Sequence, residues 1–207
     1  MRSITTAIVL TCATSSAVII DRIAVIVDKH AVKLSDVERD VRLTEFLNRQ
    51  SLSVNTTARK EAANRLVDQQ IIRNEISTGA YGRATDASAD ALQQQLRGDR
   101  FAGSDARLKQ ALSQYGLTSD QLHAQLLWQL TVLHFIDERF RPGVLVTDEQ
   151  VRNYYDQHTA LHKTAYDKAA SQIRVSLEGE QVNQDFEQWL DSARKNTHVE
   201  FCDEALK

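Results

Sequence analysis

The sequence predicts a mainly α-helical protein with a small β element that joins its two ends. All seven glycines and the single proline, Pro142, lie between segments whose apolar residues recur every three or four positions. β-Prone runs, by contrast, occur only near the two ends of the chain. Helices should therefore contain most of the residues, and the end strands should bring the two ends of the fold together.

The predicted strands are short. Near the N-terminus, Ile23–Val27 and Ala31–Leu34 flank a polar turn at Asp28 and Lys29. Near the C-terminus, "HVEFC" alternates polar and apolar residues, so Val199 and Phe201 should share one face of a third strand.

The first two predicted helices differ in how much of their surface is apolar. Ser35 and Glu38 form a start signal for a one-sided helix that follows. Residues 58–77 carry apolar side chains around most of a helix, which predicts a central position with neighbours on two sides. Residues 78–91 are expected to form a loop or frayed helix start, followed by short helices at 91–96 and 105–115.

A long helix is predicted after Leu117, where Thr118 and Gln121 form a capping box. Its main apolar stripe consists of Leu122, Leu126, Leu130, Leu133, Ile136 and Phe140. A second apolar group, Trp128, Val132 and Phe135, lies on a different side. This group could pack against another helix, as aromatic residues at helical spacing usually do, or it could bind extended peptide.

Two more helices are expected near the C-terminus. Thr147 and Gln150 form another capping box, with Val146 packing on Val151. On the helix that follows, one of Tyr154 and Tyr155 should pack inward and the other should keep its hydroxyl in water. Further apolar spacing predicts one segment from Tyr166 to Leu177 and an amphipathic helix from Val182 to Ala193.

Composition excludes several classes of protein. With 42% hydrophobic and 26% charged residues the chain should fold, and a net charge of −3 without a basic stripe argues against nucleic-acid binding. No apolar run after residue 20 is long enough to span a bilayer. Residues 1–17 resemble a secretory signal peptide cleaved before Val18, although a cytosolic tail, or a lipoprotein signal at Cys12, would fit the same letters.

No recognised catalytic, phosphate-binding or zinc-binding motif occurs in the sequence, so we expect no catalytic residue, no cofactor and no metal. His158 and His162 are four residues apart and could form half of a metal site, but no third ligand accompanies them. Cys202 would be the one thiol left after signal cleavage, which excludes an intrachain disulfide in the mature chain.

Several segments together resemble the N-terminal region of the SurA-type periplasmic chaperones and their foldase relatives. These are "DRIAVIVDKHAVKLSDVERDV", "AANRLVDQQIIRNEI", "YGLTSDQLHAQLLWQLTVLHFIDERFRPGVLVTDEQVRNYYDQH" and the closing "FEQWLDSARKNTHVEF". The resemblance implies a compact helical chaperone module in which residues 146–207 return to a helical core formed by residues 18–145. In many members of the family a parvulin-type prolyl isomerase domain follows the paired-tyrosine helix. Here only Thr159–Ala165 intervene, too few residues for a domain.

Two functional hypotheses follow. The first is a periplasmic holdase, without isomerase activity, that binds unfolded or extended segments of outer-membrane and other envelope proteins. Its clients would occupy a groove between the helical core and the paired-tyrosine helix, and the candidate peptide-binding residues are Trp128, Val132, Phe135, Tyr154 and Tyr155. The second is a non-enzymatic interaction subunit that binds one dedicated partner or forms a homodimer by exchanging its C-terminal helix.

Overall fold

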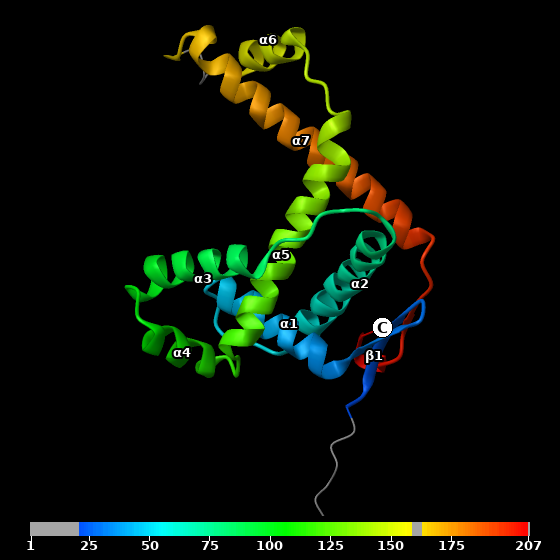
Figure 1. The fold of residues 1–207 in the computed structure, drawn as a ribbon. Coiled ribbons are helices and arrows are strands. Elements are labelled where there is room, and N and C mark those ends of the chain that lie inside the picture. Colours follow the sequence, from blue (N-terminus) through cyan, green and yellow to red (C-terminus); the bar gives the residue numbers. More distant parts are fainter. Residues whose placement is uncertain (1–20, 159–162, 207) are drawn as a thin grey trace, which may run out of the picture.

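The computed structural model describes residues 21–158 and 163–206, which form a mainly helical fold with one small antiparallel sheet (Figure 1). The helices are α1 (Leu34–Leu47), α2 (Thr56–Thr78), α3 (Asp86–Phe101), α4 (Asp105–Gln114), α5 (Ser119–Phe140), α6 (Asp148–Gln157) and α7 (Tyr166–Lys195), with 3-10 turns η1 (Arg141–Gly143) and η3 (Glu204–Leu206). The strands are β1 (Ile23–Val27), β2 (His30–Lys33) and β3 (Val199–Phe201). The predicted fold class is confirmed.

The proposed signal peptide, Cys12 and His162 lie outside the described residues. None of the helices described has the length and apolar character that crossing a bilayer requires.

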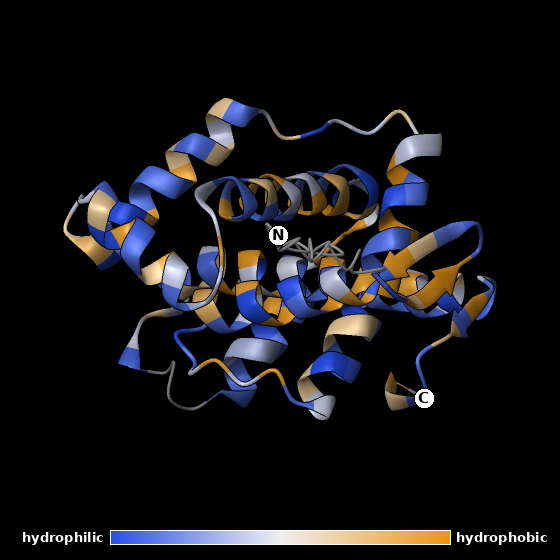
Figure 2. Ribbon diagram, turned by 90° about the horizontal axis from the view of Figure 1, so that it is seen from below, coloured by the Kyte–Doolittle hydropathy of each residue, from blue (hydrophilic) through white to orange (hydrophobic). Residues whose placement is uncertain are grey.

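The sheet joins the two ends of the described chain, as predicted. Strand β1 lies between β2 and β3, and Val25 and Val27 of β1 pair with Phe201 and Val199 of β3. Both β1 valines are fully buried, and the strands are among the most hydrophobic segments in Figure 2. Asp28 adopts a left-handed conformation (φ 53°) at the turn into β2, and its N–H donates to the carbonyl of His198 at 2.8 Å.

Helix α1 begins one residue earlier than the predicted Ser35 start. Its first turn is stabilised by the carboxylate of Asp36, which accepts from the Lys33 N–H at 3.1 Å. The Ser35 hydroxyl donates instead to Asp21 at 2.5 Å, and Glu38 pairs with Arg59 of α2. The predicted cap is therefore wrong because both of its side chains have partners outside the first turn.

Helix α2 is central, as predicted. Ala63 and Val67 pack in a cluster with the buried residues of β1 and α1, whereas Ile72 and Ile76 pack with Phe135 in a second cluster. Two polar residues of α2 also have a partner on α7, because Arg194 donates to Asn64 and Asp68. Burial raises the pKa of Asp68, an effect that the Arg194 charge opposes.

The predicted apolar stripe of α5 is only half correct. The Thr118 capping box forms, and Leu122 and Leu126 are buried against α1, α3 and α4. Farther along the helix Leu133 is 60% exposed, while Thr131 and Phe135 are buried. The buried face shifts because α5 leaves one set of neighbours and meets another, and the Thr131 hydroxyl is satisfied by the Leu127 carbonyl at 2.8 Å.

Helix α7 is one continuous helix of 30 residues, where the sequence predicted two segments. Gly179 lies inside it and Gly98 lies inside α3, so the prediction that every glycine lies between periodic segments is wrong. Helix α3 is also longer than predicted, because Thr85 caps it by accepting from the Ser88 N–H at 3.2 Å.

The two halves of α7 have different neighbours. The first half packs on α6 in a cluster with Val146 and Val151, and the second half packs on α2 and α5 through Phe186 and Trp189. Helix α6, residues 144–147 and the first half of α7 form what we call the arm, which lies apart from the sheet, α3 and α4 (Figure 1).

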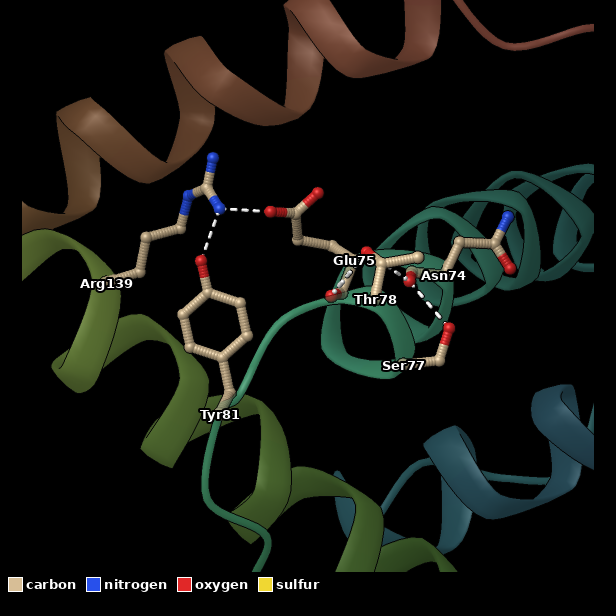
Figure 3. Close-up of polar contacts among 6 residues, drawn as sticks. All are labelled: Asn74, Glu75, Ser77, Thr78, Tyr81 and Arg139. Atoms are coloured by element: carbon tan, nitrogen blue, oxygen red, sulfur yellow. Dashed lines mark hydrogen bonds and ion pairs between the residues drawn. The ribbon is translucent and has the colours of Figure 1, made fainter.

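Arg139 of α5 connects three parts of the fold (Figure 3). It donates to the carboxylate of Glu75 on α2 and to the hydroxyl oxygen of Tyr81 at 2.6 Å. Its guanidinium carbon lies 5.1 Å from the ring centroid of Trp189 on α7. The loop after α2 reaches this position because Gly79 has no side chain, as a Cβ there would lie 2.3 Å from the Tyr81 ring.

Replacing Arg139 with Met should lower the free energy of unfolding by about 1–3 kcal/mol, because a partly buried Glu75 would lose its charged partner. Glu75→Gln should have a similar effect, and the double variant should lose clearly less than the sum of the two single variants. Urea denaturation of all three variants measures this coupling.

Arg141→Met is the matched control, since its exposed pair with Asp137 should contribute about 0.5 kcal/mol or less to the free energy of unfolding. Additive effects of Arg139→Met and Glu75→Gln would show that the two side chains do not interact.

Candidate peptide-binding surface

The structure divides the three predicted site residues of α5 between core and surface. Phe135 is fully buried, with the rings of Tyr81 and Trp189 at 4.9 and 5.4 Å. The loop after α2 and α7 cover the ring, so Phe135 is not accessible to a ligand in this structure. Trp128 and Val132 are half-buried at the edge of the same cluster, and both still reach the surface.

Trp128 lines two adjacent cavities. The first, which we call the amide cavity, has a volume of about 370 Å³ and lies between β2, α1, α2 and α5. Its polar lining includes the glutamine amides of Gln69, Gln70, Gln121 and Gln125. The second, which we call the arginine cavity, has a volume of about 360 Å³. Its lining is Arg73, Ile76, Arg83, Ala84, Ala124, Leu127, Trp128 and Thr131.

Arg73 and Trp128 form the boundary between the two cavities. The guanidinium carbon of Arg73, on α2, lies 3.8 Å from the ring centroid of Trp128 on α5, and both residues line both cavities. Sequence reasoning missed Arg73 and Arg83. No local pattern could have identified Arg73, because its partner is 55 residues away on another helix.

The acidic groups of the amide cavity have cationic partners. Asp40 is only 5% exposed, pairs with Arg65 at 2.7 Å and accepts a hydrogen bond from the Gln69 amide at 3.4 Å. Asp36 pairs with Arg39. Burial raises the pKa of Asp40, and the Arg65 charge opposes this shift. Gln69 and Gln70 already donate to Asp40 and Asn74, and Gln121 accepts from the Thr118 N–H. The amide cavity therefore offers the remaining donors and acceptors of these amides, and the Gln125 amide, beside charges that already have partners.

The paired tyrosines lie on the arm, and both are half-buried. Tyr154 stacks on His158 at 3.9 Å and lines a third cavity of about 310 Å³ with Leu145 and Leu177. Tyr155 donates its hydroxyl to the carbonyl of Thr164 at 2.7 Å. Both rings pack in the cluster that α6 forms with α7. Among the described residues only the Tyr155 hydroxyl of the pair has a protein partner, which fits the expected contrast between the two hydroxyls.

The structure therefore does not bring the five predicted residues together. Trp128 and Val132 belong to the surface of α5, and Tyr154 and Tyr155 belong to a separate cluster on the arm. His158, one half of the hypothetical metal pair, has its Nδ1 at 2.7 Å from the Tyr154 carbonyl. Of the predicted site, the part around Trp128 combines accessible aromatic surface with two cavities, and we treat it as the candidate surface.

Comparison with known proteins gives one relationship of modest strength. The chain is 26% identical over 160 residues to a protein named Chaperone SurA from Chromobacterium violaceum. The alignment covers 75% of this chain but only 37% of the relative, so the chain corresponds to a minor part of that protein's length. No family model matches the chain. The chain thus resembles a chaperone over three quarters of its length.

Proposed function

We propose that this chain is a chaperone module of the holdase type, which binds extended, partly apolar segments of unfolded envelope proteins in the periplasm. The observation that carries the proposal is Trp128, a half-buried aromatic side chain shared by two adjacent cavities. Accessible aromatic side chains beside a cavity are typical of interaction sites. The resemblance to Chaperone SurA supports a polypeptide as the ligand.

The chemistry of the two cavities suits an extended peptide. A glutamine side chain both donates and accepts hydrogen bonds, so the amide cavity can satisfy peptide N–H and C=O groups that lack partners in an unfolded chain. Trp128, Ile76 and Leu127 offer apolar contact beside it. Such a surface favours polypeptide segments in general, because it relies on groups that every chain possesses.

We also infer that this module does not catalyse prolyl isomerisation. Helix α6 ends at Gln157 and α7 begins at Tyr166, so the connection between them is far shorter than the ~50 residues of the smallest domains. A parvulin-type domain therefore has no room at the position where the related foldases carry one.

The test is a client-protection assay. The protein should slow the aggregation of an unfolded outer-membrane β-barrel protein on dilution from urea, measured by light scattering, while Trp128→Ser should lose most of this protection at a nearly unchanged unfolding midpoint. Leu133→Ser removes an exposed apolar side chain of the same helix and is the matched control. In a parallel assay, a proline peptide should isomerise at its uncatalysed rate, over roughly tens to hundreds of seconds.

Full protection by Trp128→Ser, or equal losses in Trp128→Ser and Leu133→Ser, would contradict the assignment of the binding surface to Trp128. Protection of no client by the unaltered protein would contradict the holdase function itself. Catalysis of the proline peptide would contradict the inferred absence of isomerase activity.

A second candidate function is that of an interaction subunit with one dedicated partner or a second copy. It is favoured by two large apolar side chains on the arm, Leu145 and Val175, which are 84% and 64% exposed. Leu145 also lines the third cavity beside Tyr154. Light scattering coupled to size-exclusion chromatography distinguishes the two, because a dimer formed through the arm should dissociate in a Leu145→Asp variant, whereas a monomeric holdase should be unaffected.

A further inference from the structure

We propose that the arginine cavity recognises an aspartate or glutamate side chain of an extended polypeptide segment, with apolar residues next to it in the sequence. The inference rests on the proposed function, because it takes the ligand at Trp128 to be a polypeptide. It adds a chemical preference that the function alone does not contain, namely that clients with a carboxylate beside apolar residues bind more tightly.

The first argument is the charge of the cavity. Arg73 and Arg83 both line it, and no acidic side chain does. Within residues 21–158 and 163–206, neither arginine makes a hydrogen bond or ion pair, whereas Arg139 of α5 pairs with Glu75. Acidic side chains of the surroundings already have partners, since Asp40 and Asp36 of the adjoining amide cavity pair with Arg65 and Arg39. Glu138 accepts from the Gly82 N–H at 2.7 Å. The cavity is thus a local positive site on a chain with a net charge of −3.

The second argument is the position of the Arg73 guanidinium. Its carbon lies over the Trp128 ring, 3.8 Å from the centroid, and its N–H groups have no hydrogen-bond partner among the described residues. A planar guanidinium with accessible edge donors matches the two oxygens of a carboxylate. Although the Arg73 residue is exposed overall, partial burial of its guanidinium lowers its pKa. A less hydrated cation has less water to lose when an anion binds.

The third argument is the surroundings of the two arginines. Ile76, Leu127 and Trp128 present apolar groups beside the charges, so a small hydrated anion would leave this surface uncovered. A carboxylate with apolar neighbours satisfies both parts of the lining. The amide cavity adjoins it across Arg73 and Trp128, where glutamine amides can bind the backbone of the same segment. A lipid acyl chain has no groups that could form hydrogen bonds with these amides, so the lining favours a peptide as the ligand.

The test uses two fluorescein-labelled peptides with the same extended apolar sequence, one with a central Glu and the other with Gln at that position. Both are blocked at their ends, so that the side chain carries the only difference in charge. Fluorescence anisotropy should show that the unaltered protein binds the Glu peptide roughly three- to tenfold more tightly. Arg73→Gln and Arg83→Gln should each reduce this preference, and the double variant should abolish it. Arg107→Gln, an equal charge change at an exposed position of α4, should retain it.

Equal affinity for the two peptides in the unaltered protein would overturn the inference, as would a preference that survives in the double variant. A preference lost equally in Arg107→Gln would show a general charge effect and overturn it too. A fourth contrary result is that Arg73→Gln weakens binding to vesicles containing phosphatidylglycerol but leaves both peptides unaffected, since the ligand would then be a lipid. If clients are protected but the Glu and Gln peptides bind with equal affinity, only this inference fails. If no client is protected and neither peptide binds, the proposed function fails with it.

Discussion

Removing residues 181–207 should abolish cooperative unfolding of the whole protein. This segment contributes Trp189 and Leu190 to two hydrophobic clusters, the strand β3 to the sheet, and Leu206, which is 4% exposed, to the core beside α2. Without it, the apolar faces of β1 and α2 would be in contact with water. Circular dichroism and differential scanning calorimetry should show a broad transition with little excess heat, in place of one sharp transition.

A suitable control keeps the segment but changes its solvent face. Glu187→Gln alters an exposed residue of α7 and should leave the free energy of unfolding within about 0.5 kcal/mol of that of the unaltered protein. A synthetic peptide of residues 181–207, added to the truncated chain, should restore part of the cooperative transition, because its helix is too short to be stable unless it docks. A truncated chain that melts at the midpoint and enthalpy of the full chain would show the segment to be an appendage.

Phe135→Ala should lower the free energy of unfolding by about 3–5 kcal/mol, the second large effect that we expect. The ring is fully buried and lies against three other rings, those of Tyr81, Phe140 and Trp189, so its removal leaves a cavity that no single neighbour can fill. Urea denaturation monitored by circular dichroism measures the loss.

Leu133→Ala is the control for this variant, because Leu133 is an apolar residue of the same helix that is 60% exposed. Its substitution should cost about 0.5 kcal/mol or less. If the two variants lost similar amounts, the assignment of the buried face of α5 would be incorrect.

Local signals predicted the beginnings of α5 and α6 because a capping box involves residues only three apart. Thr118 and Gln121 exchange hydrogen bonds of 2.9 and 3.2 Å, and Thr147 and Gln150 do so at 2.8 and 3.2 Å. The same reasoning failed at Ser35, whose hydroxyl binds Asp21, a residue 14 positions away. It also failed at Gly179, because the cost of a glycine in a helix, about 1 kcal/mol, is outweighed by packing on both sides of it.

The candidate site was predictable only where a single helix carries it. The spacing of Trp128, Val132 and Phe135 placed them on one side of α5, but spacing alone does not distinguish a ligand contact from a contact with another helix. The structure resolves this through Trp189, which covers Phe135 and leaves Trp128 accessible. Arg73 and Arg83 join the site only when α2 and the loop after it pack beside α5, so periodicity contained no signal for them.

Helix α7 also has a mechanical consequence. At 1.5 Å per residue its 30 residues form a rod about 45 Å long, of which the first half belongs to the arm and the second half leads to β3 of the sheet. Along the described chain the arm is otherwise joined to the core by residues 141–143, so its angle to the core depends on how stiffly α7 resists bending. We expect α7 to bend most easily at Gly179, near its middle, because this residue has no side chain and a Cβ there would touch nothing within 4 Å. A force on the arm would therefore act through α7 on the packing of Trp189 and on the position of β3, which follows α7 in the chain.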